Sequence, residues 1–272
     1  MRAKRSNHAK GPAPARGPQL WRPREHGDRW LYGRHPVTAA LANPERRWRR
    51  LAVLAGQEAE AAALAAAAQA ERRGEGDAVR VLDRNGLAAL LPEGAAHQGL
   101  ALEADPLEPG DLDDLLRALH GVERAVLVVL DQVTDPHNVG AILRAAAAFG
   151  ARAVIVPAHG APPATGALAK AASGALELVP LIPEVNLARA LDRLKEAGFW
   201  CCGLDERAPR LLAEIDIGPR AALVLGAEGD GLRRLVRERC DYLARLPTSE
   251  AMPSLNVSTA AAVALYAVTK GG

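Results

Sequence analysis

The stretch RAVLVVL (residues 124–130) is apolar after its first residue and rich in valine. It shows no alternation of polar and apolar residues, which is typical of a strand buried on both faces of a parallel sheet. Five similar runs follow, at residues 153–156, 176–181, 199–204, 221–225 and 242–246. Helical patterns fall between most of them, at residues 139–149, 166–173, 187–197, 232–239 and 255–269. We therefore expect residues 122–272 to form a doubly wound α/β domain whose functional loops follow the carboxyl ends of its strands.

The chain before this domain predicts a second, smaller α/β unit. Its strand patterns lie at residues 30–33, 50–55, 78–82 and 99–103, and its helical patterns at 35–42, 58–73 and 85–91. Pro106, Pro109 and Gly110 then interrupt the rhythm, and a short acidic helix follows. We expect residues 30–103 to form the first domain and residues 104–121 to be a linker.

The amino-terminal tail differs in charge from the rest. Residues 1–29 contain eight Lys and Arg against two acids, although the whole chain has a net charge of only +2. A basic segment rich in Pro and Gly lacks the apolar surface to fold, so a disordered tail is expected. Such a tail either has no specific role or attracts nucleic acid through its charge.

Composition excludes several classes of protein. The longest apolar runs fall short of the roughly 18–20 residues that a membrane span needs. Cys201, Cys202 and Cys240 form neither an even set nor a CxxC pair. This pattern argues against a disulfide framework or a zinc ribbon, and it fits buried thiols in a reducing cytoplasm. We find no spacing of His, Cys, Asp and Glu that indicates a metal site.

The first of three chemically informative clusters is DQVTDPHNVGAILR (residues 131–144), which follows a buried strand and opens a helix. Asn138 is either the N-cap of that helix or a functional residue. Gly140 allows either close helix packing or close approach of a ligand. The polar run is longer than a strand-to-helix turn needs, and Arg144 belongs to the helix that follows it.

The second cluster, LGAEGDG (residues 225–231), is a glycine loop between a strand and a helix. Its spacing is GxxGxG, so it matches neither the dinucleotide motif GxGxxG nor a phosphate-binding P-loop. Glu228 within the loop would repel a phosphate. A ligand with a positive group, or with hydroxyls that donate to a carboxylate, suits this loop better.

The third cluster, LPTSEAMPSLNVST (residues 246–259), leads into an apolar helix at the end of the sequence. Ser254, Asn256, Ser258 and Thr259 are more capping residues than one helix needs. The cluster is therefore either an ordinary capped helix or part of a binding site.

Together, NVGAILR, LGAEGDGL and LPTSEAMPSLNVSTAAAVALY resemble the three motifs of SpoU-type RNA 2′-O-ribose methyltransferases of the SPOUT superfamily. LYGRHPVTAAL and HQGLALE are similar to the amino-terminal RNA-binding domain of bacterial 23S ribosomal RNA guanosine-2′-O-methyltransferases. The resemblance implies a mostly parallel sheet with a trefoil knot near the carboxyl terminus, S-adenosylmethionine as cofactor, and RNA, most specifically 23S ribosomal RNA, as substrate. It implies neither a metal nor a membrane partner.

The resemblance also implies roles for individual residues. The cofactor pocket would involve Gly226, Leu246 and Leu255. The polar active-site positions would be Asn138, Arg144, Glu228, Ser254 and Asn256. The family's proposed base corresponds to Arg144, although arginine stays protonated in proteins. Arg144 is therefore either transiently neutral or a phosphate and alkoxide ligand, and the second reading agrees better with its chemistry. Glu228 would pair with Arg144 or hold the loop.

A homodimer through the second domain is the expected assembly, because the resemblance implies it and the helix at residues 255–269 is apolar on nearly all sides. Two other functions remain open at this point. One is 2′-O-methylation of transfer RNA. The other is a non-catalytic RNA-binding or ribosome-assembly protein, although binding alone would not require both the glycine loop and the loop that contains Asn256.

Overall fold

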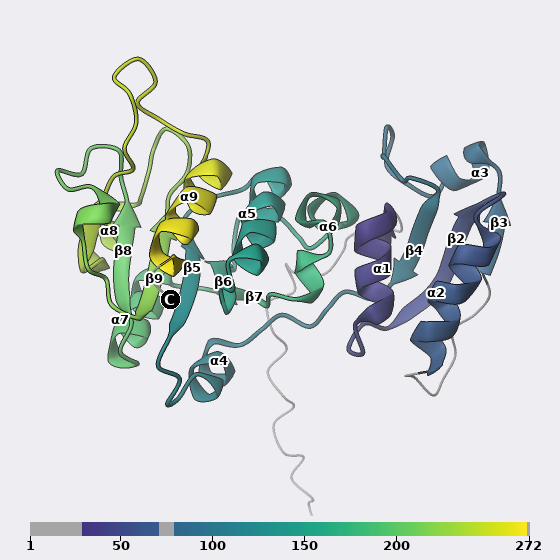
Figure 1. The fold of residues 1–272 in the computed structure, drawn as a ribbon, viewed down its shortest axis with the longest axis horizontal. Helices are drawn as coiled ribbons and strands as arrows, with labels where there is room; N and C mark the ends of the chain where they lie inside the picture. Colours follow the sequence, from purple (N-terminus) through teal and green to yellow (C-terminus); the bar gives the residue numbers. More distant parts are fainter. Residues whose placement is uncertain (1–28, 71–78, 271–272) are drawn as a thin grey trace, which may run out of the picture.

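The computed structural model describes residues 29–70 and 79–270, which form two sheets joined through a layer of helices (Figure 1). The basic tail expected at residues 1–29 lies outside the described residues except for Arg29. In the described part of the chain, no helix combines the length and the apolar character needed to span a membrane.

The first sheet has four strands in the order β1-β4-β2-β3, with β2 and β3 parallel and the other pairs antiparallel. Its strands are β1 (Trp30–Tyr32), β2 (Trp48–Leu54), β3 (Val79–Leu82) and β4 (Leu100–Ala104). Its helices are α1 (Arg34–Ala42), α2 (Glu58–Ala70) and α3 (Arg84–Ala88). Buried residues of α1 and α2 pack on one face, while Leu87 of α3 packs on the other.

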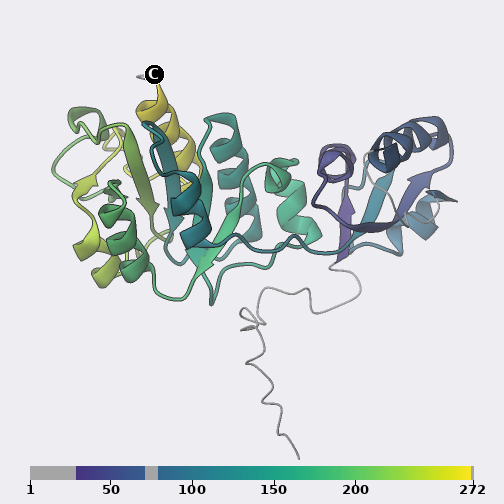
Figure 2. The ribbon, with the colours of Figure 1, turned by 90° about the horizontal axis from the view of Figure 1, so that it is seen from below.

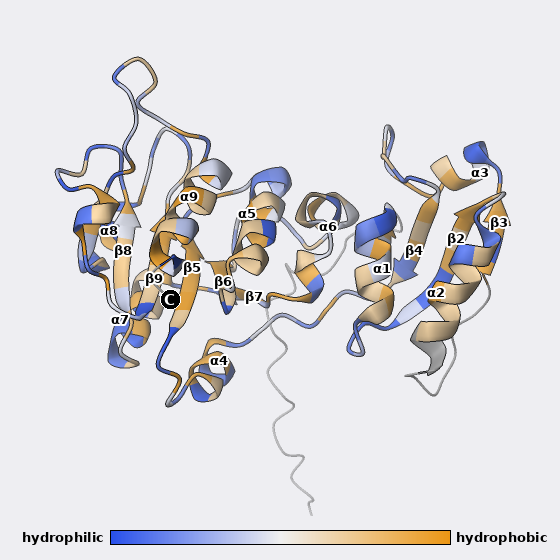
Figure 3. Cartoon of the chain, viewed as in Figure 1, coloured by the Kyte–Doolittle hydropathy of each residue, from blue (hydrophilic) through white to orange (hydrophobic). Residues whose placement is uncertain are grey.

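The second sheet has six parallel strands in the order β10-β8-β9-β5-β6-β7. The strands are β5 (Ala125–Leu130), β6 (Ala153–Pro157), β7 (Leu181–Glu184), β8 (Trp200–Leu204), β9 (Arg220–Leu225) and β10 (Tyr242–Ala244). Successive residues of β5 point to opposite faces, and both faces are buried, which explains the continuous apolar run. Figure 3 shows this apolar character along the strand.

Helices cover both faces of the second sheet (Figure 2). On one face lie α5 (Pro136–Ala148), α6 (Gly166–Ala172) and α9 (Val257–Thr269). On the other lie α4 (Leu112–Ala118), α7 (Leu187–Glu196) and α8 (Arg234–Arg239). The α/β class and the mostly parallel sheet are confirmed. The trefoil knot stays a prediction.

One local expectation was wrong, and one of the alternatives left open for Asn138 is excluded. The run at residues 176–181 was expected to be a strand, but Ala175–Glu177 form a 3-10 helix and β7 begins only at Leu181. A helical turn buries Leu176 and Val179 on one side while Leu178 is 74% exposed, so the run packs against helices rather than in a sheet. Likewise, Asn138 is not the N-cap of α5. Asp135 takes that position, where its side chain accepts a hydrogen bond from the backbone N–H of His137, and Pro136 is the first helical residue.

The two sheets share one hydrophobic core. Its largest cluster joins residues of α1, β2 and β4 to residues of β5, α5, α6 and α9. A Cβ atom on Gly166 of α6 would overlap the carbonyl of Trp30 in β1, so only glycine allows this approach. Beyond the other end of α6, Arg46 donates to Glu177 at 2.5 Å, and both side chains are at most 4% exposed. The relative position of the sheets is therefore fixed by packing and by a buried ion pair.

Candidate active site

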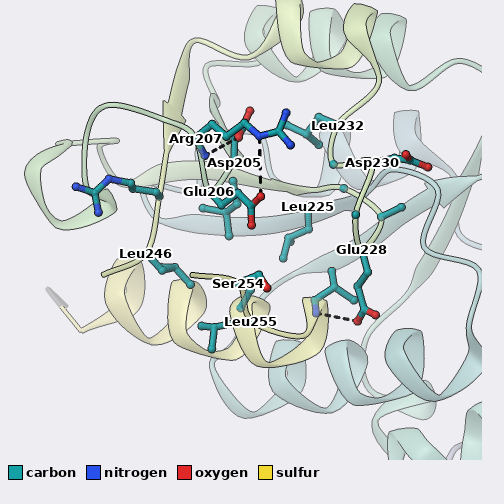
Figure 4. Close-up of a pocket in the computed structure, with 18 of the residues that line it drawn as sticks. Asp205, Glu206, Arg207, Leu225, Glu228, Asp230, Leu232, Leu246, Ser254 and Leu255 are labelled. Carbon is teal, nitrogen blue, oxygen red and sulfur yellow. Dashed lines mark hydrogen bonds and ion pairs between the residues drawn. The ribbon is translucent and has the colours of Figure 1, made fainter. Parts of the chain in front are cut away.

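A pocket of about 410 Å³ lies where the carboxyl ends of β8, β9 and β10 meet the start of α9. It is lined by residues 204–207, 225–232, 244–246, 248, 253–257, Arg237 and Ala260. Figure 4 shows Leu246, Ser254 and Leu255 on one wall, with Asp205, Glu206 and Arg207 across from them. All three residues expected to contact a cofactor (Gly226, Leu246 and Leu255) line this pocket, as do Glu228, Ser254 and Asn256.

The glycine spacing of the second cluster follows from the path of this loop. A Cβ on Gly226 would overlap the backbone of Gly231, because the loop turns back and pairs Ala227 with Gly231. Gly229 and Gly231 have φ angles of 88° and 67°, which favour glycine. The GxxGxG pattern therefore describes a tight reversal of the chain at the pocket wall.

Hydrogen bonds bring one residue of each cluster together. The Asn256 side chain donates from Nδ2 to Glu228 Oε1 at 2.7 Å and to Asn138 Oδ1 at 3.0 Å. Asn138 Nδ2 donates to the same Glu228 oxygen at 3.4 Å, and the backbone N–H of Val257 does so at 3.3 Å. Glu228 thus accepts several N–H donors at once, and it links the glycine loop to the starts of α5 and α9.

Asn256 also caps α9. Its Oδ1 accepts hydrogen bonds from the backbone N–H groups of Ser258 and Thr259, at 2.9 and 3.4 Å, and from Ser258 Oγ at 2.6 Å. The ordinary capped-helix interpretation is therefore correct for Asn256, and the same side chain serves the pocket through its Nδ2. Ser254 is exposed and lines the pocket.

Arg144 lies apart from this network. It is exposed on α5, does not line the pocket, and forms no hydrogen bond or ion pair with any residue in the described ranges 29–70 and 79–270. The expected alternative in which Glu228 pairs with Arg144 is not seen in the single chain, where Glu228 instead binds Asn138, Asn256 and Val257. Gly140 serves helix packing, since its Cβ would lie 2.5 Å from Ala171 Cβ of α6.

Sequence reasoning missed one wall of the pocket. Asp205, Glu206 and Arg207 follow β8, and Asp205 forms a 3.1 Å ion pair with Arg237 of α8. The sequence did contain a pattern that could have predicted this wall. Polar residues that follow a buried parallel strand lie at the carboxyl edge of the sheet, where binding sites form. The neighbouring strand β9 already carried the glycine loop at that edge.

Asp131 was also missed as an anchor. It is fully buried at the end of β5, and its carboxylate accepts hydrogen bonds from Arg233 N at 2.8 Å and Arg233 Nε at 2.6 Å. Arg233 directly precedes α8 and follows the glycine loop. Asp131 therefore ties the end of that loop to the strand from which the first cluster starts.

The described residues contain no group of His, Cys, Asp and Glu that could hold a metal ion. The three thiols lie in β8 and at the end of α8, where burial raises the pKa of Cys201 and Cys240 to about 12 and that of Cys202 to about 11. They remain protonated at neutral pH, so they are unsuited to act as nucleophiles.

Two family models match the chain. The model described as the SpoU rRNA Methylase family matches residues 125–266. The model described as RNA 2′-O ribose methyltransferase substrate binding matches residues 30–110. Together they cover both sheets, and the first includes all five polar positions and all three pocket residues discussed above.

Curated relatives and solved structures agree with these matches. A protein of Coxiella burnetii named 23S rRNA (guanosine-2′-O-)-methyltransferase RlmB is 40% identical over 242 residues, which cover 88% of this chain and 94% of the relative. The protein of that name from Vibrio cholerae is 41% identical, with 87% and 94% covered. The SpoU methyltransferase AviRb of Streptomyces viridochromogenes, solved in complex with AdoMet, has the same fold, with a TM-score of 0.72, 24% identity and 90% of each chain covered.

Proposed function

Because the chain belongs to the SpoU rRNA methylase family, we propose that it transfers a methyl group from S-adenosylmethionine to a ribose 2′-hydroxyl of RNA, with a guanosine of 23S ribosomal RNA as substrate. One observation carries this proposal: Asn138, Glu228 and Asn256, each from a different motif, meet at the edge of the pocket. The activity named for the relatives supports RNA as the substrate. We expect the enzyme to act in the cytoplasm, because that is where ribosomal RNA is found.

The pocket fits the cofactor in size and chemistry. Its volume of about 410 Å³ lies within the roughly 300–1,000 Å³ of small-molecule sites. Leu225, Leu246 and Leu255 give it apolar surface, while Glu206 and Glu228 supply carboxylates that suit a ligand with positive groups and ribose hydroxyls. When bound, S-adenosylmethionine supplies a methyl group already activated by its positively charged sulfur.

The protein's main task is then alignment, because the methyl donor needs no further activation. Holding two reactants in line contributes roughly 7–11 kcal/mol in favourable cases. Glu228 and Asn256 fix the glycine loop against the start of α9, and Asn138 fixes the start of α5 to both. We assign these three residues, with Ser254, to positioning the pocket wall and the ribose.

Arg144 has a different role in this proposal. Its guanidinium is exposed and uncommitted within the described part of one chain, so it is available to the RNA. Arginine stays protonated in proteins, and its planar guanidinium can donate two parallel N–H hydrogen bonds to an oxygen anion. We assign Arg144 to binding a substrate phosphate and stabilising negative charge on the 2′-oxygen, while the proton leaves to another group.

We propose a homodimer formed through α9. Val263 and Tyr266 on this helix are 40% and 50% exposed, and Ala267 beside them is also exposed. These residues leave an apolar face uncovered on a helix whose other side is buried by its own chain. A second copy would cover this face, and close packing is favoured by the small side chains of the helix.

The direct test combines the purified protein, methyl-labelled S-adenosylmethionine and an unmodified 23S ribosomal RNA transcript. We expect label in RNA, at a single ribose 2′-oxygen of a guanosine. Arg152, exposed beyond the far end of α5, provides a matched control: Arg152→Ala should methylate normally and Arg144→Ala should not. Label in transfer RNA but not in 23S ribosomal RNA would move the substrate assignment, and absence of label in any RNA would overturn the activity.

A further inference from the structure

Lys170 of α6 lies at the junction of the two sheets. It contacts two segments of the first sheet, around Gln98 and Arg34, that do not line the pocket. Its Nζ donates a 2.8 Å hydrogen bond to Oε1 of Gln98, just before β4. The backbone N–H of Arg34, at the start of α1, donates to the same oxygen at 3.2 Å. The motifs LYGRHPVTAAL and HQGLALE are thus joined to α6 through one atom, the side-chain oxygen of Gln98, which accepts hydrogen bonds from Arg34 and Lys170.

The ammonium of Lys170 has no carboxylate partner among the described residues. In that part of the chain the lysine ion pairs are those of Lys195 with Asp192 and Asp241. Lys170 is half-buried, and this burial lowers its pKa. Desolvation therefore disfavours the charged form in the free protein, and an anion placed next to Nζ would offset that cost.

A second cation comes from Arg34, the residue whose backbone N–H shares the Gln98 oxygen with Lys170. The Arg34 side chain is 56% exposed and pairs with Glu60, whose side chain is 37% exposed. Exposed ion pairs of this kind contribute only about 0–1 kcal/mol, so a phosphate can replace the carboxylate at little cost. Within the part of the chain that the structure describes, the junction therefore presents an ammonium without a carboxylate partner and a guanidinium with an exchangeable one.

The junction and the pocket open to the same edge of the molecule. The strands of the second sheet end at the upper edge in Figure 1, where the loops that form the pocket lie. The start of α1 and the start of β4 lie at that edge too, because β1 runs antiparallel to β4. A polymer laid along this edge can reach the pocket and the junction at once.

We propose that Lys170, with Arg34 beside it, binds a phosphodiester of the substrate RNA, so that one RNA segment spans both sheets. The identity of the polymer rests on the proposed function, but the chemistry of the contact does not. A phosphate contact contributes affinity and register without reading the base. Lys170 therefore sets how the RNA lies across the enzyme, while other contacts choose the nucleotide.

The test measures binding of an unmodified 23S ribosomal RNA transcript across salt concentrations. Lys170→Gln removes the charge, Lys170→Arg keeps it, and Lys195→Gln removes an equally half-buried lysine that already has carboxylate partners. We expect Lys170→Gln to weaken binding about three- to tenfold and to lower the slope of log K against log salt by about 0.7–0.9, the value for one phosphate. Lys170→Arg and Lys195→Gln should keep the wild-type slope.

A purely structural lysine would give another result. Lys170→Gln would then lose affinity with an unchanged salt slope, or Lys170→Arg would lose slope as well, and either outcome overturns the proposal. If Lys170→Gln does not fold, Lys170→Met is measured in its place, because it removes the charge while keeping an apolar stem, and the same drop in slope is expected. Methyl transfer is measured separately at saturating RNA on the wild-type protein and on Lys195→Gln, which should retain the wild-type rate because Lys195 pairs with Asp192 and Asp241. A wild-type protein that binds RNA with the expected slope but transfers no methyl group would refute the proposed function and leave the phosphate site standing.

Discussion

Removing one partner of the buried Arg46–Glu177 pair should destabilise the whole protein. The two side chains are 3% and 4% exposed, and the Arg46 Nε and Nη2 atoms donate to Glu177 at 2.5–3.2 Å. Asn43 Nδ2 donates to the same carboxylate at 2.7 Å. Leaving a buried charge without its partner costs about 3–5 kcal/mol. At about 2–4 °C per kcal/mol for a domain of 150–250 residues, Glu177→Gln or Arg46→Met should lower Tm by roughly 6–20 °C.

The double variant and a surface control make this prediction specific. Arg46→Met combined with Glu177→Gln removes both charges, so it should be less destabilised than the sum of the single variants by about 2–3 kcal/mol. Arg49→Met breaks a 3.0 Å pair with Asp105 that is largely exposed, and it should cost at most about 1 kcal/mol. Urea unfolding of each protein measures these differences. Single variants no less stable than Arg49→Met would refute the reasoning that this pair is desolvated.

Five further predictions concern the active site, the exposed face of α9 and the thiols. Arg144→Ala should abolish methyl transfer while cofactor affinity, measured by calorimetry, stays within a few-fold; near-normal turnover would remove its catalytic role. Arg144→Lys should retain partial activity that rises little with pH, whereas a steep gain toward high pH would indicate a titrating base. Gly226→Ala should lose cofactor binding because its Cβ overlaps the loop backbone, and wild-type affinity would show that the loop can relax. Ala267→Glu should give monomers in light scattering, whereas Ala264, fully buried in its own chain, would report on folding instead. The three thiols should react slowly with a thiol reagent at pH 8 in the native protein and fast in urea, since thiolate forms only near pH 11–12; fast native labelling would contradict their burial.

The layer architecture could be predicted because the burial of a strand on one or both faces determines its pattern of apolar residues. Strands buried on both faces, such as β5 and β9, read as unbroken apolar runs, and glycine spacing marked the tight loop at Gly226. The run at residues 176–181 has the same apolar content, but its burial comes from contacts with α1 and α5. Periodicity over six residues does not distinguish these environments.

The site was predictable only in part, for a geometric reason. Asn138, Glu228 and Asn256 could be named from motifs, but their shared hydrogen bonds join residues 28 to 118 positions apart, and no local pattern encodes such contacts. The wall at residues 205–207 carries no motif. Its place in the pocket depends on β8 lying next to β9, which is a property of strand order rather than of local sequence.

The shared core of the two sheets has a consequence during synthesis. Arg46 lies 131 residues before Glu177, and the 3-10 helix that buries it leaves the ribosome after most of the first sheet is complete. At about 5–20 residues per second, the nascent chain waits roughly 7–26 s between the two. For that interval Arg46 lacks Glu177, and the part of α1 that contacts α6 and the 3-10 helix stays in water. The flank of the first sheet that packs on α6 and the 3-10 helix is therefore open while the chain is being made, and we expect chaperones that shield apolar surface to contact it until those elements emerge.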